Sequence, residues 1–281
     1  MTTPDFVVIG HAVRDLVPQG WRLGGTATFA SEQALRLGLR VGIVTRVGPE
    51  LALQEVLPDV EVAGRPSIAT TCFENVYDDG RRHQRVLAQA EPIGAEDIPS
   101  TWRGAPMVLL GPVIGEVPPG LGETFPRSLV GVSAQGWLRR IDRQRRVWRR
   151  AWAGPPFWSD CQVLFVSYED LGRRRDQVAR WAEEVPMVAL TADRRGAHLH
   201  VENRWRSIKA FPVREVDPTG AGDVFAAAFL VRYHETEDAA ESARFASAAA
   251  ACSVEASGTE GIVGRREIEA RMEAHPEIVL R

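Results

Sequence analysis

A glycine-rich segment that ends in an acid is the part of this sequence best suited to chemistry. Residues 217–223 read Asp-Pro-Thr-Gly-Ala-Gly-Asp, and the apolar run that follows them predicts a helix. Small residues let backbone N–H groups face an anion, and a helix N-terminus adds partial positive charge at the same point. Because a bound phosphate would repel an acid there, we interpret Asp223 as a general base that takes a proton from an attacking hydroxyl. The alternative is an ordinary glycine turn, capped by Asp217 or Thr219, ahead of a buried helix.

The elements that must position this segment alternate between strands and helices. Continuous aliphatic runs of this kind predict a parallel sheet covered by helices on both faces. Ligands of such sheets lie beyond the carboxyl ends of the strands, so the residues just after each strand are candidates for the site. Strands are predicted at 6–10, 41–48, 107–111, 129–133, 163–167 and 187–191, and a helix at 29–37.

Residues 70–89 depart from this pattern and predict a β-hairpin. Their alternate positions are too polar for a core strand, and Asp78-Asp79-Gly80 offers an Asp-Gly turn. The residues alone leave two interpretations open, a surface hairpin without function and a flap that covers an active site.

Composition limits the classes of function. With 281 residues, 44% of them hydrophobic, the chain is long enough for one large α/β domain. Its formal net charge of −3 provides no general attraction for nucleic acid or an anionic membrane. No apolar run approaches the ~20 residues of a membrane-spanning helix, and residues 1–5 lack the basic start of a signal peptide. Three separated cysteines, Cys72, Cys161 and Cys252, form no zinc-ligand pattern, so we expect a cytoplasmic protein.

One arginine-rich stretch allows a different interpretation. Residues 139–150 lie among Trp137, Trp148 and Trp152, and basic residues with aromatic neighbours can bind single-stranded nucleic acid. Since the whole chain is negative, we expect instead a solvated surface segment with tryptophans anchored in the core. We therefore expect neither nucleic acid nor membrane among its partners.

The segment 217–223 resembles the second signature of the ribokinase-like carbohydrate kinases, the PfkB family. Residues 23–30 read Leu-Gly-Gly-Thr-Ala-Thr-Phe-Ala and lead into a helix that closes on Leu37-Gly38, which resembles the family's first signature. The resemblance implies a ribokinase-like three-layer α/β sandwich with a mostly parallel central sheet and a small β-hairpin lid. It also implies a single kinase domain over 1–281, with a lid formed mainly by 67–90 and a second contribution from 12–23.

The resemblance implies catalytic and acceptor-binding roles. Asp223 would be the base, while the amides of Gly220, Ala221 and Gly222 hold the developing negative charge. In the family an acid after the first strand accepts hydrogen bonds from two sugar hydroxyls, and Asp15 stands at that point. A carboxylate suits such a vicinal diol, although a solvated loop acid is the alternative. The implied acceptor site consists of Asp15, Gly24, Gly25, Thr26 and Gln135.

The family's metal motif has a counterpart here. An Asn-x-x-Glu motif orders Mg²⁺ in the family, often through water, and residues 167–170 read Ser-Tyr-Glu-Asp. Ser167 then replaces the Asn and Asp170 the Glu, and either Glu169 or Asp170 would hold the hydrated ion. The alternative is a helix N-cap with acids in the first turn, and both interpretations can hold together. Asp217 is implied as a ligand of K⁺, which several family members bind beside the anion hole.

ATP is the phosphoryl donor that the resemblance implies. Residues 191–196 resemble the family's Thr-x-Gly-x-x-Gly nucleotide loop with Asp193 in place of the middle glycine, the alternative being a polar turn between two strands. The small-residue helix from Ala246 would border the adenine or simply pack closely on the sheet. The implied nucleotide site consists of Thr191, Gly196, Thr219, Gly220, Gly222, Ser253 and Gly258.

The resemblance implies a kinase that transfers the γ-phosphoryl group of ATP to a sugar or cyclitol hydroxyl. Residues 24–29, 133–139 and 217–219 together are most similar to the myo-inositol kinase-like branch, which favours a small polyol as acceptor. A nucleoside or phosphosugar kinase of the same family is one alternative, and a non-catalytic binding or regulatory relative is another. The resemblance also allows a homodimer formed through the lid.

Overall fold

The computed structural model describes residues 2–78, 81–154, 158, 160–172, 174 and 176–281, and a nine-stranded sheet forms its centre. Seven neighbouring strands run parallel, and two further strands at one edge are joined through antiparallel pairings. Most consist of the short aliphatic runs seen in the sequence, which favour fully buried strands. The order is β15 (Arg204–Ile208), β14 (Ala197–Val201), β13 (Met187–Thr191), β12 (Val163–Ser167), β9 (Leu129–Ser133), β8 (Met107–Leu110), β1 (Phe6–Ile9), β4 (Val41–Val44) and β5 (Val60–Ala63).

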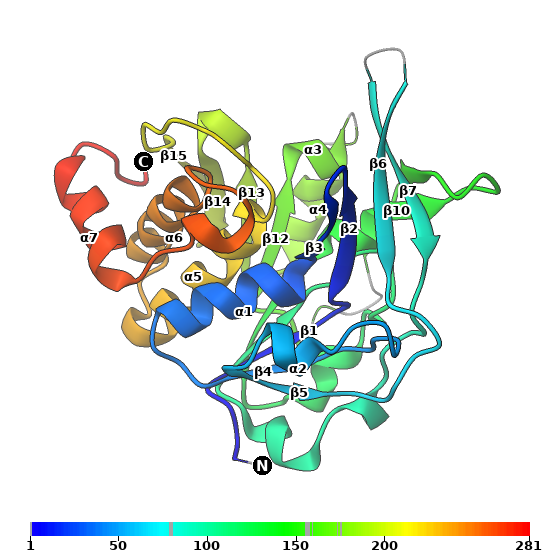
Figure 1. Cartoon of the computed structure of the whole chain (residues 1–281). Coiled ribbons are helices and arrows are strands. Elements are labelled where there is room, and N and C mark those ends of the chain that lie inside the picture. The colour runs from blue at the N-terminus through cyan, green and yellow to red at the C-terminus, as the bar shows by residue number, and fades with distance from the viewer. Residues whose placement is uncertain (1, 79–80, 155–157, 159, 173, 175) are drawn as a thin grey trace.

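Both faces of the sheet are buried, which confirms the expected α/β sandwich. On β1, Phe6 and Val8 belong to one hydrophobic core, whereas Val7 and Ile9 belong to a second core on the opposite face. The first core contains residues from α1 (Thr26–Arg36), α2 (Leu53–Val56), α5 (Ala221–Thr236), α6 (Ala239–Ser253) and α7 (Arg265–Ala274). The second contains residues from α3 (Tyr168–Leu171) and α4 (Asp176–Glu184). Figure 1 shows α1, α5, α6 and α7 gathered on one side.

A second sheet of four strands lies beside the sandwich (Figure 1). Its order is β3 (Gly20–Gly24), β2 (Val13–Val17), β6 (Cys72–Asp78) and β7 (Arg81–Ala88), and β2 and β6 pair in parallel. The segments 12–23 and 67–90 therefore contribute to one sheet, which we call the lid sheet. The Asp79-Gly80 turn expected at the tip of the hairpin lies outside the described residues.

Element boundaries differ most from the sequence prediction at the start of α1 and at the end of β4. Helix α1 begins at Thr26, three residues before the predicted start, because Gly25 takes the N-cap position with a φ of 84° that favours glycine. Strand β4 ends at Val44 and not at residue 48. The next side chains turn to other partners, since Thr45 accepts the Ala12 N–H and Arg46 pairs with Asp97 at 2.8 Å.

The arginine-rich stretch is only partly the surface segment that we predicted. It contains a small hairpin of β10 (Arg139–Ile141) and β11 (Val147–Arg149), in which Trp148 is exposed. Trp137 is buried in the core as expected, but Arg139 lines the main pocket. Among the described residues, no helix combines the length and the apolar character needed to cross a bilayer.

Candidate active site

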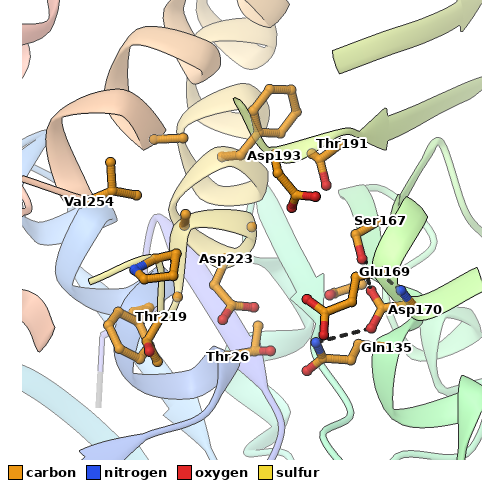
Figure 2. Close-up of a pocket in the computed structure, with 18 of the residues that line it drawn as sticks. Thr26, Gln135, Ser167, Glu169, Asp170, Thr191, Asp193, Thr219, Asp223 and Val254 are labelled. Atoms are coloured by element: carbon orange, nitrogen blue, oxygen red, sulfur yellow. Dashed lines mark hydrogen bonds between the residues drawn. The ribbon is translucent and has the colours of Figure 1, made fainter. Parts of the chain in front are cut away.

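A cavity of about 1010 Å³ opens at the carboxyl ends of β9, β12 and β13. These strands end at Ser133, Ser167 and Thr191, and all three residues line the cavity. The lid sheet provides one wall and the N-terminus of α5 another. Figure 2 shows Asp223 and Thr26 facing Gln135, Glu169 and Asp170 across this space, with Thr191 and Asp193 beyond. The topology therefore gathers polar side chains from distant segments, as the strand-end argument predicted.

The start of α5 has the features of an anion-binding site. Gly220 is the N-cap residue and has a φ of 78°, in the left-handed region that favours glycine. A Cβ atom at Gly220 would lie 2.2 Å from the ring of Phe29, so the turn also needs the missing side chain. In the described part of the chain, the N–H groups of Gly220 and Gly222 donate no hydrogen bond. Unsatisfied N–H groups at a helix N-terminus attract anions.

Asp223 lies in the first turn of this helix and lines the cavity. Burial raises the pKa of its carboxyl group to about 6, and the nearby charge of Asp170 acts in the same direction. A hydrogen bond with Thr26 and the positive charge of Arg139 oppose this rise. A carboxylate with a pKa near 6 is still ionised at neutral pH and is a stronger base than an exposed aspartate. The environment therefore suits proton abstraction.

The residues expected to bind the acceptor lie mostly in the cavity wall. Asp15, Gly25, Thr26 and Gln135 line it, whereas Gly24 does not. A Cβ atom at Gly24 would lie 2.1 Å from Asp15 Oδ2, so Gly24 leaves room for that carboxylate group. The need for glycine at this position is thus explained by packing against the acid.

The expected metal residues form a linked group. Ser167 Oγ donates to Asp170 Oδ2 at 2.6 Å and accepts the Asp170 N–H at 3.0 Å, so Ser167 is also the N-cap of α3. Gln135 Nε2 donates to Asp170 Oδ1 at 3.3 Å. Glu169 lines the cavity and pairs with Arg149 at 3.4 Å. No cluster of three or more metal-binding side chains occurs in the described ranges, but hydrated Mg²⁺ needs only one or two carboxylates beside phosphate oxygens. Asp170 and Glu169 fit that requirement.

The expected nucleotide residues are divided between the cavity and the core. Thr191, the last residue of β13, and Gly196, in the connection to the antiparallel strand β14, line the cavity, so the polar-turn interpretation also holds. Asp193, at a φ of 50°, points into the same space (Figure 2). Ser253 is absent from the lining, because it is buried and its Oγ donates to the Ala250 carbonyl oxygen at 2.9 Å. The remaining expected residues, Thr219, Gly220, Gly222 and Gly258, line the cavity together with Val254.

Asp217 is held by groups from both sides of the cavity mouth. Its carboxylate accepts the N–H groups of Thr219 at 3.0 Å and Gly258 at 3.2 Å. Arg22 of the lid sheet lies 3.7 Å from Asp217 and donates to Ser257 at 2.7 Å. Although burial opposes the effect, these hydrogen bonds and the charge of Arg22 hold the pKa of Asp217 below its usual value. No motif in the sequence pointed to Arg22.

Arg139 is the second arginine that sequence reasoning missed. It directly follows the 3-10 helix η4 (Ala134–Leu138), which carries Gln135, and it lines the cavity. The available signal was its place a few residues after the end of β9, where the fold gathers functional side chains.

Comparison of the sequence with known proteins supports a kinase. Residues 167–263 match the family model described as pfkB family carbohydrate kinase. A cytidine kinase from Thermococcus kodakarensis is 26% identical over 249 residues, which cover 82% of this chain and 88% of the relative. An inositol 3-kinase from Oryza sativa subsp. japonica is 28% identical over 258 residues. That match covers 79% of this chain but only 61% of the plant protein.

Solved structures share the fold along almost the whole chain. A pyrophosphate-dependent kinase in the ribokinase family, complexed with a pyrophosphate analog and myo-inositol, has a TM-score of 0.75. It is 20% identical, and the match covers 95% of this chain and 99% of the other. Arabidopsis thaliana ribokinase, complexed with ribose and ATP, has a TM-score of 0.73 at 18% identity, covering 97% and 99%. At these identities the similarity shows the fold alone.

Proposed function

We propose that the chain is a PfkB-family carbohydrate kinase that transfers the γ-phosphoryl group of ATP to a hydroxyl of a cyclitol such as myo-inositol. The broader class, a sugar or nucleoside kinase and hence a phosphotransferase, follows from the family. The observation that carries the proposal is the partly buried carboxylate of Asp223, with its pKa of about 6, beside the unsatisfied amides of Gly220 and Gly222 at the start of α5.

In the proposed reaction, Asp223 accepts the proton of the attacking hydroxyl as its oxygen approaches the γ-phosphorus. The amides of Gly220 and Gly222 face the charge that develops on the phosphoryl oxygens, whereas the Ala221 N–H, which was expected to join them, donates to the Pro218 carbonyl oxygen at 3.3 Å in this structure. Asp15 accepts hydrogen bonds from two other hydroxyls of the acceptor and thereby fixes which one reaches Asp223. The lid sheet covers the acceptor and excludes water, which limits wasteful hydrolysis of ATP.

Asp170 and Glu169 are the residues that would hold hydrated Mg²⁺, oriented by Ser167 and Gln135. When bound, the ion supplies positive charge to the phosphates of the donor. Thr191, Gly196 and Gly258 line the part of the cavity that we assign to the nucleotide.

The charge of the cavity favours a neutral acceptor. Seven acidic residues and four arginines are among the described residues that line it, so an acceptor without phosphate meets less repulsion. A ring of hydroxyls also suits the two oxygens of Asp15. The similarity to a cytidine kinase favours a nucleoside as the second candidate acceptor.

The proposed function is tested by one panel of acceptors under identical conditions. We expect kcat/KM for myo-inositol to exceed those for ribose, fructose, fructose 6-phosphate, cytidine and adenosine, with ATP and Mg²⁺ present. If kcat/KM for another acceptor exceeds that for myo-inositol by more than about tenfold, which is about 1.4 kcal/mol in transition-state binding, the cyclitol assignment is overturned. Pyrophosphate in place of ATP tests the donor, and no ATP consumption with any acceptor would support a non-catalytic relative.

We also propose that K⁺ binds beside Asp217 and that Arg22 competes with it for this carboxylate. Replacing Na⁺ by K⁺ at constant ionic strength is expected to raise turnover, and to raise it further in Arg22→Ala. The reason is that the substitution removes a fixed positive charge from the carboxylate. Steady-state rates in both salts measure the effect, and equal rates in Na⁺ and K⁺ for both proteins would contradict it.

A further inference from the structure

Three of the four arginines that line the cavity already pair with acids in its wall. Arg22 lies 3.7 Å from Asp217, Arg149 lies 3.4 Å from Glu169, and Arg194 lies 3.1 Å from Glu215. The fourth, Arg139, forms no ion pair within 4 Å with any described residue. The one hydrogen bond of its side chain to them runs from Nη1 to the Val113 carbonyl oxygen at 3.1 Å. Since a guanidinium has five N–H donors in a planar fork, most of its binding capacity is left for a ligand.

The loop that anchors Arg139 is fixed in place. The buried carboxylate of Glu116 accepts the N–H groups of Val113 and Ile114 at 2.8–3.0 Å, which orients the carbonyl group that Arg139 uses. On the other side, Gly136 donates its N–H to the Pro112 carbonyl oxygen at 2.9 Å. A Cβ atom at Gly136 would lie 2.4 Å from Pro112, so only glycine allows this close packing. These rigid neighbours therefore fix the position of the Arg139 guanidinium group.

Arg139 lies among the groups assigned to acceptor, metal and proton transfer. It interacts electrostatically with Asp170, Glu169, Asp223 and Asp15. The phosphoryl group must pass between donor and acceptor within this set. We propose that Arg139 binds the phosphoryl group during its transfer, and so complements the amides at the start of α5. The inference rests on the proposed function.

The step that Arg139 assists is a direct displacement. The acceptor oxygen forms a bond to the γ-phosphorus while the bond from that phosphorus to the β,γ-bridging oxygen breaks. The hydroxyl proton moves to Asp223, and the electron pair of the broken bond leaves with ADP. Charge accumulates on the equatorial phosphoryl oxygens, which the guanidinium fork can contact through two parallel hydrogen bonds.

Two other roles for Arg139 predict different results. As a mere counter-charge for the four acids, it would change their titration without binding phosphate. As a ligand for an acidic group on the acceptor, it would affect the KM of charged acceptors alone. The experiment therefore separates phosphate binding, kcat, acceptor KM and pH dependence.

Arg139→Gln and Arg139→Lys are compared with Arg140→Gln, a matched change at the next, exposed residue, which does not line the cavity. We expect kcat to fall about 10²–10³-fold in Arg139→Gln, with acceptor KM changed less than threefold. In Arg139→Lys, kcat should be about tenfold higher than in Arg139→Gln, because lysine restores the positive charge without the guanidinium fork. The acid limb of the kcat/KM profile should move to higher pH in Arg139→Gln, because the positive charge that lowers the pKa of Asp223 is removed. The other groups that act on Asp223, namely Thr26 and Asp170, are unchanged.

Calorimetric titration with inorganic phosphate provides a readout that needs no acceptor. We expect affinity to fall at least tenfold in Arg139→Gln and to stay at the wild-type value in Arg140→Gln. If no acceptor in the panel is phosphorylated, the proposed function fails while this titration still decides the role of Arg139. Unchanged phosphate affinity, or a loss confined to the KM of charged acceptors, overturns the inference. If circular dichroism shows Arg139→Gln unfolded, wild-type kcat in Arg139→Lys overturns it.

Discussion

Replacing Asp223 by asparagine should lower turnover by about 10²–10⁴-fold while the affinity for ATP changes little. Asparagine keeps the shape of the side chain but cannot accept the proton of the attacking hydroxyl. The amides at the start of α5 are left in place, so binding of the donor phosphates should persist. Steady-state kinetics with the best acceptor, together with ATP titration by calorimetry, measure both parts of this prediction.

The same variant should be more stable than the wild type at neutral pH. Burial raises the pKa of Asp223 from 3.8 to about 6, so the folded state holds this proton more tightly than the unfolded state. The carboxyl group therefore favours the folded state below pH 3.8, and this contribution is lost as the pH rises through 6. Keeping it ionised at pH 7.5 costs about 3 kcal/mol, which Asp223→Asn relieves. Thermal unfolding at pH 7.5 should thus show a higher midpoint in the less active protein.

The pH profile of the wild type provides an independent check. Because the base must be ionised, kcat/KM should fall about tenfold per pH unit below 6. Asp59→Asn, the same change at an exposed position outside the cavity lining, should alter neither kinetics nor stability. Near-normal turnover in Asp223→Asn, or a flat profile between pH 5 and 7, would remove Asp223 from the proposed role.

The sequence predicted the sheet and much of the cavity wall because these depend on local patterns. Aliphatic runs specified buried strands, and the rule that ligands lie beyond their carboxyl ends pointed to the ends of β12 and β13. Segment 217–223 likewise predicted an anion-binding site at the start of a helix, through its small residues together with the acids at both ends. Each of these signals lies within a few neighbouring residues, so no knowledge of distant contacts was needed.

Features that depend on distant contacts could not be predicted in this way. Arg139 enters the cavity because Gly136 packs on Pro112 and the Val113 carbonyl oxygen accepts its N–H, and these partners lie more than 20 residues away in the chain. Ser253 was expected at the nucleotide but is turned into the core by a hydrogen bond within its own helix. In both cases the outcome depends on a side-chain direction, which a pattern of residue types does not specify.

The packing around Gly220 leads to the second large effect that we expect, in the variant Gly220→Ala. An added Cβ atom would lie 2.2 Å from the Phe29 ring, and the φ of 78° at this residue disfavours any side chain. The turn must therefore shift and move the amide groups that we propose to face the phosphoryl oxygens. Loss of their alignment should lower kcat by about 10²-fold, the cost of removing one donor from an oxyanion site.

Gly222→Ala separates this effect from a general intolerance of alanine in the segment. A Cβ atom at Gly222 would meet no atom within 4 Å other than its chain neighbours and the backbone of its own helix, and its φ is not in the left-handed region. We expect Gly220→Ala to lose about 1–3 kcal/mol of folding free energy, whereas Gly222→Ala keeps or slightly increases it because alanine favours the helix. Urea unfolding and kcat, measured on both variants, test the prediction. Equal stability and equal turnover in the two would show that the fit between Gly220 and Phe29 does not hold the amides in place.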